Sequence, residues 1–346
     1  MAVATYSIFD RDLAALPERH GVTRDSFHAE VRPAAEPVIL RGLVANWPAV
    51  TAAQNGGIAD YLSARASDAP TPTILAPSST GGRYFYNADM SGFNFERRNI
   101  PVRRTLEKLT ELDGATDPIG IYAGATSTNN SVPGFAADNP MPVLGTDVEP
   151  LIWVGNSARI APHFDTHENI ACSVAGARTF VLFPADQVDN LYIGPLDRTM
   201  AGPPASLVDP RAVDAGRFPR FEQAVSAARV AVLQPGDAIY MPPLWWHYVE
   251  STGPLNVLVN YWWNDAGDDD VMASLALVML LLRERPVAER RAWATLFDHY
   301  VFGENAADVA AHIPEAARSI LGTKTPARDA YMKRYLRGQL GRTLDN

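Results

Sequence analysis

The chain has 346 residues, of which 47% are apolar, and its formal net charge at pH 7 is −9. That is enough apolar material for one large or two ordinary domains, which excludes a wholly disordered chain. The acidic balance argues against a nucleic-acid-binding protein, because phosphate backbones repel acidic surfaces. The single cysteine, Cys172, excludes a disulfide framework and a cysteine-rich zinc module.

The sequence also predicts no association with a membrane. The longest apolar run, residues 271–282, is too short to cross a bilayer. The N-terminal segment is acidic by Asp10 and lacks the basic start and apolar centre of a secretory signal. We therefore expect a globular protein in the cytoplasm.

The first half of the chain predicts mixed α and β structure. Residues 37–43 and 118–124 are apolar runs typical of strands, and residues 103–112 favour a helix. Residues 131–150 hold four prolines and two glycines, so we expect a long ordered loop there.

From Leu151 the sequence changes to short β-rich segments separated by turn signals, which predicts an all-β barrel or sandwich. Residues 192–220 are rich in proline and glycine and are expected to form a surface loop between two strands. After Asp265 the pattern becomes helical. Residues 271–282 are apolar nearly all round, so this helix must be buried against the barrel or a second subunit. Aspartates precede it and arginines follow it, which suits the helix dipole, at Asp268, Asp269, Asp270, Arg283 and Arg285. A second helix is predicted from the spacing of Trp293, Leu296, Phe297 and Tyr300.

The candidate metal ligands begin with an H-x-D motif, His163 and Asp165, on one of the β-rich segments. Residues two apart on a strand point to the same face, so these side chains are predicted to project together. A second histidine, His247, stands 84 residues further on. Two imidazoles and one carboxylate on one face of an octahedron leave open positions, which is typical of non-haem Fe(II) oxygenases. On these three residues alone, a pair of hydrogen-bonded core histidines is an equal alternative.

Extending the same alternation predicts the lining of a pocket. One face carries polar or small side chains, at His167, Asn169, Ala171 and Ser173, and the other mostly apolar ones, at Phe164, Ile170, Cys172 and Val174. His163 and His167 would form a zinc-binding pair only on a helix, and Pro162 beside them argues against a helix. We therefore expect His167 to support the metal ligands or to face the substrate, and Cys172 to be buried packing.

Longer segments around these residues resemble a known family. They are APHFDTHENIACSVAGARTFVLFP (161–184), QPGDAIYMPPLWWHYVES (234–251) and VLVNYWWN (257–264), with PVILRGL and YFYNADMSGFNF upstream. These segments are similar to the Jumonji-C, or cupin-like, 2-oxoglutarate oxygenases, and closest in pattern to the asparaginyl hydroxylases that act on hypoxia-inducible factor. The resemblance covers about residues 30–265. It implies a mainly β fold, a double-stranded β-helix or jelly-roll barrel, with mixed α/β elements before it and helices after it.

The resemblance identifies His163, Asp165 and His247 as the iron ligands. It also places a basic residue 15 positions after the first ligand, to pair with the far carboxylate of 2-oxoglutarate, and here that residue is Arg178. A guanidinium suits this role because it binds a carboxylate through two hydrogen bonds. The alternative for Arg178 is an arginine on the surface of a strand.

Other residues match positions around the co-substrate. Asn169 and Asn260 match residues that hydrogen-bond the co-substrate or its water network, and Tyr122 matches a tyrosine that reaches the same carboxylate. For each, an ordinary buried polar group is the alternative. Ile160 departs from the pattern, since the asparaginyl hydroxylases carry a threonine there and isoleucine cannot donate a hydrogen bond. Trp262 is a candidate to face the substrate. The other members of the two aromatic clusters are expected in the core, namely Trp245, Trp246, Tyr261 and Trp263.

The sequence therefore predicts an Fe(II)- and 2-oxoglutarate-dependent oxygenase that uses O₂ to hydroxylate a protein or peptide side chain or a small molecule. Two rivals remain open: a cupin-type metalloenzyme with zinc or another divalent ion and no 2-oxoglutarate, and a non-catalytic cupin-fold binding protein. Residues 1–265 are expected to form the catalytic domain. Residues 266–346 are expected to form a homodimer through their helices, as the resemblance implies.

Overall fold

The computed structural model describes residues 5–200, 202–265 and 271–344. The chain divides into two compact units, residues 1–267 and 268–346, and each is described here by itself. Among the described residues, no helix has both the length and the apolar character needed to cross a membrane.

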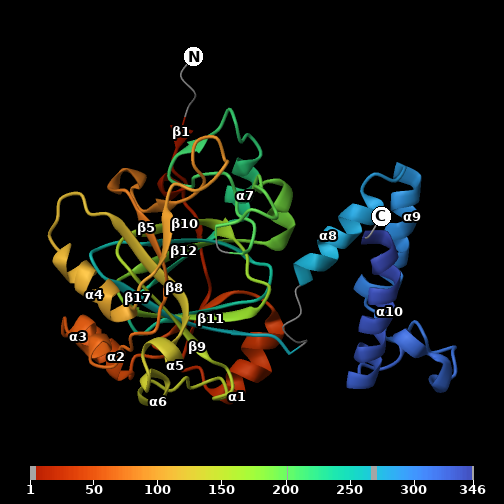
Figure 1. Cartoon of the computed structure of the whole chain (residues 1–346), viewed down its shortest axis with the longest axis horizontal. Helices are drawn as coiled ribbons and strands as arrows, with labels where there is room; N and C mark the ends of the chain where they lie inside the picture. Colours follow the sequence, from red (N-terminus) through yellow and green to blue (C-terminus); the bar gives the residue numbers. More distant parts are fainter. Residues whose placement is uncertain (1–4, 201, 266–270, 345–346) are drawn as a thin grey trace. The chain divides into compact units, whose positions relative to one another are not determined.

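The first unit is built on two large β-sheets (Figure 1). The nine-stranded sheet contains, in spatial order, β3 (Glu18–His20), β4 (Val38–Arg41), β15 (Ala238–Met241), β11 (Glu168–Ala175), β17 (Asn256–Trp263), β9 (Pro150–Gly155), β8 (Gly120–Ser127), β5 (Pro72–Ala76) and β7 (Glu96–Asn99). The six-stranded sheet contains β2 (Ala14–Ala15), β14 (Arg229–Leu233), β12 (Arg178–Phe183), β16 (Trp246–Ser251), β10 (Ala158–His163) and β6 (Arg83–Tyr84). A separate pair joins β1 (Thr5–Tyr6) and β13 (Val213–Asp214). The strands predicted after Leu151 are therefore confirmed.

The inner faces of the two sheets pack against each other. Ala171 of β11 lies in one core cluster with Phe180 of β12, on the opposite sheet. The neighbours of Ala171 along β11, including Ile170 and Cys172, belong instead to a second cluster on the outer face of the nine-stranded sheet. Side chains of a strand point alternately to its two faces, so the predicted division of this segment is correct. Two facing sheets of mainly antiparallel strands form the predicted jelly-roll barrel.

Helices cover the outer face of the nine-stranded sheet. The helices of this unit are α1 (Arg24–Ser26), α2 (Pro48–Gln54), α3 (Ile58–Ser63), α4 (Val102–Glu111), α5 (Thr128–Ser131), α6 (Phe135–Asp138) and α7 (Phe221–Ala227). In α4, Val102, Leu106 and Leu109 are spaced by one helical turn and are buried in the second core cluster. Figure 1 shows α2, α3 and α4 lying outside the barrel strands.

Two predicted loops are more structured and more buried than expected. Residues 131–150 contain the helical turn α6, and Phe135 in it is fully buried. The surface-loop prediction for residues 192–220 is wrong in part, because Ser206 and Val208 are fully buried and β13 lies within the segment. Proline and glycine exclude regular structure, but they do not by themselves decide whether a segment is exposed.

The second unit is helical, with α8 (Val271–Leu282), α9 (Val287–Phe297) and α10 (Pro326–Leu344). The first two were predicted, with Tyr300 lying in a π-helical turn that follows α9; α10 lacks an apolar stripe and was not. No side chain of α8 is buried, and Leu280 is 62% exposed. The predicted N-terminal aspartates, residues 268–270, lie outside the described residues. Within its own unit, α8 therefore keeps an apolar surface without a partner.

Candidate metal centre

Strand pairing brings the two candidate histidine ligands together. β10 and β16 pair antiparallel with His163 opposite His247, and the centroids of their rings are 4.3 Å apart. The alternation had predicted Asp165 on the same strand as His163. That placement is wrong, because β10 ends at His163 and Asp165 lies in the loop that follows. The carboxylate still reaches the histidines: one ligand atom from each of the three residues lies within 4.8 Å of the others. The three residues therefore form a compact donor set.

Both histidines are held with the same ring nitrogen pointing away from the protein backbone. Nδ1 of His163 lies 2.9 Å from the carbonyl oxygen of Ala161, and Nδ1 of His247 lies 3.0 Å from that of Trp245. When Nδ1–H donates to a carbonyl, the lone pair of Nε2 remains for a metal ion. Burial, and after it the neighbouring His247, lower the pKa of His163 to about 4, so this ring is neutral at neutral pH. Both features are those of metal-binding histidines.

The carboxylate of Asp165 is oriented by a chain of hydrogen bonds. Asn169 and Trp262 donate to its Oδ2 at 2.9 and 3.1 Å. Asn260 donates in turn to Asn169 at 3.3 Å, and Trp153 donates to Asn260 at 2.7 Å. Partners of this kind fix the geometry of a ligand and commonly change metal affinity 10–100-fold when removed. The sequence had not singled out Trp153. The alternation of side chains along β9, which turns Trp153 toward the cavity, was the one signal that could have found it.

Two of the residues matched to co-substrate positions thus support the carboxylate of Asp165, Asn169 directly and Asn260 through Asn169. Asn169 and Asn260 line the cavity beside Asp165, and Trp262 does so as well. His167 also lines the cavity, in the loop before β11, so the helical zinc pair does not form. Ser173 was predicted on this face, but its hydroxyl donates to the carbonyl of Gly176 and it is not part of the lining.

A buried cation lies in the same cavity. Arg178, the first residue of β12, is 3% exposed and its guanidinium interacts with the hydroxyl of Tyr122. Burial lowers the pKa of Arg178, and Tyr122 opposes that shift. Among the described residues, no carboxylate is paired with this guanidinium. A buried charge without a counter-charge is costly, so this position fits the anionic group of a ligand.

A buried hydroxyl beside Tyr122 has no hydrogen-bond partner among the described residues, and the sequence had not singled it out. Tyr84 is 2% exposed and lines the cavity, and its ring stacks on that of Tyr122 with centroids 5.7 Å apart. Within the described residues, the Tyr84 hydroxyl has no hydrogen-bond partner. Tyr84 is the register partner of Ile160 on β10. A buried hydroxyl is therefore present beside the position where Ile160 supplies none.

The donor set and the buried cation share one cavity of about 660 Å³. This volume is within the usual range of small-molecule sites and leaves room beyond a five-carbon dicarboxylate. Two histidines and one carboxylate fit Fe(II) with open coordination positions, and they would also accept zinc. The guanidinium of Arg178, which has no counter-charge, and the Tyr84 hydroxyl, which has no hydrogen-bond partner among the described residues, fit a carboxylate of a bound ligand. The residues present therefore fit Fe(II) together with 2-oxoglutarate.

Comparison with known proteins gives one family and several relatives. A family model described as a cupin-like domain matches residues 24–269. Jumonji C domain-containing protein 5 of Drosophila melanogaster is 25% identical over 264 residues, and lysine-specific demethylase JMJ30 of Arabidopsis thaliana is 26% identical over 258 residues. Each match covers 72% of this chain, which spans 59% and 55% of the length of these two relatives. HSPB1-associated protein 1 of Bos taurus is 31% identical over 153 residues, which is 42% of this chain and 31% of that protein.

Proposed function

This chain belongs to the cupin-like, Jumonji-C family, and we propose that it is an Fe(II)- and 2-oxoglutarate-dependent oxygenase. The observation that carries the proposal is that two unlike binding groups meet in one cavity. One is the donor set of two histidines and a carboxylate, and the other is a buried guanidinium without a counter-charge. Enzymes that use 2-oxoglutarate need both, whereas a metal-only site needs the first alone.

Each residue has a defined part in this proposal. His163, Asp165 and His247 hold Fe(II), with Asn169, Asn260 and Trp262 orienting the carboxylate. Arg178 binds the far carboxylate of 2-oxoglutarate and Tyr122 hydrogen-bonds the same group. When bound, iron with 2-oxoglutarate and O₂ supplies an oxidant strong enough to attack an unactivated C–H bond. The protein positions the reactants and, by enclosing them in a largely buried cavity, limits the access of water.

The two rival functions differ from this proposal at Arg178. A zinc-dependent cupin enzyme or a non-catalytic binding protein has no need of a buried cation next to the metal ligands. An anaerobic titration separates the three. Addition of 2-oxoglutarate to the Fe(II)-loaded protein should produce a weak visible charge-transfer band. A protein that binds Fe(II) but shows neither a band nor 2-oxoglutarate binding by calorimetry would contradict the proposal.

Hydroxylation is the reaction we propose, of a protein or peptide side chain or of a small molecule. Some of the relatives are named as lysine-specific demethylases, and demethylation by this chemistry begins with hydroxylation of an N-methyl group. Residues 1–265 would carry this activity. The narrower likeness to asparaginyl hydroxylases and the cytoplasmic location stay predictions from the sequence.

Tyr84 is expected to contribute to co-substrate affinity. Tyr84→Phe should raise the dissociation constant of 2-oxoglutarate by about 3- to 10-fold, the usual worth of one hydrogen bond. Because the hydroxyl makes no hydrogen bond in the described part of the protein, the variant should keep its thermal stability. The measurement is calorimetric titration of the Fe(II)-loaded protein under anaerobic conditions.

Tyr86→Phe is the matched control for this variant. The Tyr86 hydroxyl donates to the carbonyl of Arg198 at 2.5 Å, and Tyr86 does not line the cavity. This control should lose some stability and leave 2-oxoglutarate affinity unchanged. Equal affinity in wild type and Tyr84→Phe would exclude Tyr84 from the co-substrate site.

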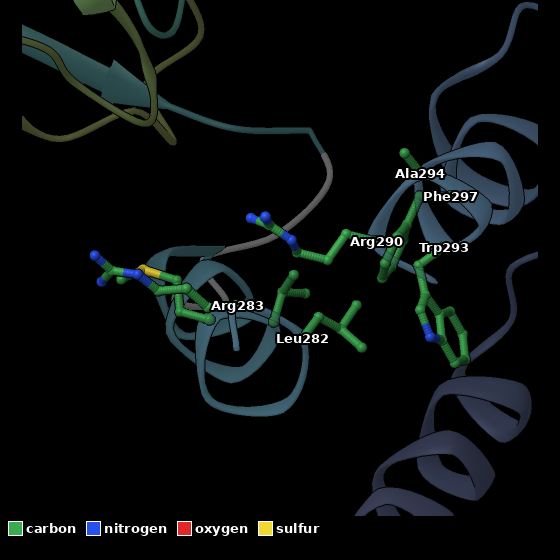
Figure 2. A pocket seen from close by; sticks show the side chains of 8 residues that line it. Leu282, Arg283, Arg290, Trp293, Ala294 and Phe297 are labelled. Atoms are coloured by element: carbon green, nitrogen blue, oxygen red, sulfur yellow. The ribbon is translucent and has the colours of Figure 1, made fainter. Parts of the chain in front are cut away.

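The C-terminal unit is proposed to form a homodimer. An open apolar groove of about 260 Å³ lies between α8 and α9, lined by side chains such as Leu282, Trp293 and Phe297 (Figure 2). Several apolar side chains of the same unit are exposed, among them Leu280 at 62% and Phe302 at 75%. Monomeric proteins rarely leave a contiguous apolar surface of this kind uncovered, so a second copy is the proposed partner.

Trp293→Glu is expected to dissociate this dimer. Tryptophan at an interface commonly contributes about 2 kcal/mol or more, so the dimer dissociation constant should rise roughly 30-fold or more. Thr295→Glu is the matched control, since it adds the same charge on the opposite side of α9. Light scattering over a range of concentrations measures both variants. A wild-type protein that remains monomeric at micromolar concentrations would disprove the dimer.

A further inference from the structure

The charges that line the cavity are unusual for this chain. The protein carries 39 acidic and 30 basic side chains, but among the described residues that line the cavity the only carboxylate is Asp165. Two guanidinium groups, those of Arg97 and Arg178, line the same cavity. If Asp165 binds the metal ion, the described part of the lining keeps no anionic side chain to receive a cationic substrate. The cavity is therefore suited to anions.

Arg97 is separate from the co-substrate site built around Arg178. It lies on β7, and its register partner Ile74 on β5 lines the cavity beside it. β7 is the last strand of the nine-stranded sheet, and Arg97 is exposed, whereas Arg178 is buried. Arg97 therefore lies where the cavity meets solvent, on the side from which a substrate can approach.

The guanidinium of Arg97 is held in place by neutral groups. It donates to the carbonyl oxygen of Met200 and lies over the rings of Phe93 and Phe95, 4.9 and 5.3 Å from their centroids. Among the described residues, no carboxylate forms an ion pair with it. Its position is thus set in advance, while most of its donors are not committed to a charged partner. A preorganised cation of this kind loses little entropy when it binds a carboxylate.

From these features we infer that Arg97 binds a carboxylate of the substrate, so that the protein selects substrates with an acidic group near the position oxidised. This inference rests on the proposed oxygenase function and names the substrate class of the same site. Two sources have this chemistry: a protein segment with an aspartate or glutamate near the target residue, and a small carboxylic acid. Cationic substrates are disfavoured, because the described lining offers them no free carboxylate and Arg97 places a positive charge where they would enter.

Arg98 provides a matched control on the same strand. It is exposed like Arg97 but does not line the cavity, and it pairs with Glu96 at 2.6 Å. Arg97→Glu and Arg98→Glu change the net charge of the protein equally. Any difference between the two variants is therefore local to the cavity and cannot come from the overall charge.

The test measures binding of labelled peptides by fluorescence anisotropy to the full chain loaded with Fe(II) and 2-oxoglutarate under anaerobic conditions. The first pool contains Asp and Glu at randomised positions, the second contains Asn and Gln instead, and the third contains Lys and Arg. Wild type should bind the acidic pool about tenfold more tightly than the Asn/Gln pool, as expected for one charge-assisted hydrogen-bonded contact. Arg97→Glu should abolish this preference and favour the basic pool, whereas Arg98→Glu should keep it within about twofold.

Small acids form the second arm. A set of C3 to C6 carboxylic acids is tested as competitors of the acidic pool and as stimulators of succinate formation. Competition and stimulation that are lost in Arg97→Glu would assign the site to small acids, and their absence, with the acidic pool still bound, would assign it to a protein segment. Equal losses in Arg97→Glu and Arg98→Glu, or a wild type that shows no preference for acid, would overturn the inference.

Failure of the inference about Arg97 can be distinguished from failure of the proposed oxygenase function. Binding of 2-oxoglutarate by calorimetry and uncoupled succinate formation test the oxygenase proposal in wild type, and both should be unchanged in Arg98→Glu, which lies outside the cavity lining. If wild type binds no 2-oxoglutarate, the oxygenase proposal fails, and the peptide measurement made with Fe(II) alone then still decides on Arg97.

Discussion

Replacing Arg178 by alanine should weaken 2-oxoglutarate binding about 30-fold or more while leaving iron binding nearly unchanged. Removing one partner of a desolvated charge pair typically costs about 2–5 kcal/mol, and about 1.4 kcal/mol corresponds to tenfold in affinity. Arg178 is 3% exposed and has no carboxylate partner among the described residues, so the carboxylate of the ligand would be its counter-charge. The measurement is uncoupled succinate formation as a function of 2-oxoglutarate concentration, with calorimetry for direct binding.

The conservative variant distinguishes a specific contact from a general need for positive charge. Arg178→Lys should recover only part of the affinity, because a compact ammonium on a shorter stem cannot make two parallel hydrogen bonds to a carboxylate. Iron content, measured on the same samples, serves as the control, since Arg178 is not in the donor set. Superimposable curves for wild type and both variants would remove Arg178 from the site, and with it the main support for 2-oxoglutarate.

Replacing His247 by alanine should reduce iron retention more than about 100-fold and abolish co-substrate turnover. Removing a residue that only orients a ligand already costs 10–100-fold in metal affinity, and His247 would be a ligand itself. Its Nε2 lies 3.7 Å from Oδ2 of Asp165, so the alanine would leave a gap in the donor set. His163→Ala and Asp165→Ala should behave in the same way. Iron analysis after gel filtration and succinate formation are the two measurements.

A graded series makes this prediction specific to the assigned residues. His167→Ala removes an imidazole from the same loop without touching the three donor residues, so iron retention should stay close to that of wild type. Asn169→Ala should give an intermediate loss of 10–100-fold, because it only orients Asp165. Circular dichroism melting curves control for folding. Near wild-type turnover in His247→Ala would show that the ligand assignment is wrong.

The sequence alone predicted the features that depend on neighbouring residues. The alternation along residues 168–175 placed Ala171 on the inner face of the barrel and Cys172 on the outer face, because the pleat of a strand is a local property. The helix at residues 103–112 was predicted for the same kind of reason, since its apolar positions repeat once per turn. The H-x-D motif likewise placed His163 and Asp165 close together, although the strand ends between them.

Contacts between distant segments could be found only in the tertiary structure. Tyr84 and Arg97 approach the cavity from strands that are far from the H-x-D motif in the chain, and Trp153 approaches it from the strand before β10. Their local sequence did not identify any of the three as a site residue. The loop at residues 192–220 shows the same limit, since its prolines and glycines indicate a loop but its burial depends on what packs over it.

The same distinction between local sequence and tertiary structure applies to the chemistry of the candidate site. The residue types and their spacing left an iron site and a pair of core histidines as equal alternatives, and the family resemblance added the assignment of the iron ligands and of a guanidinium for a carboxylate. The register of β10 with β16 sets His247 beside His163, and the burial of Arg178 leaves it without a counter-charge. Both depend on strand pairing and packing across the whole barrel, because register and burial are properties of the assembled sheets and not of any one segment.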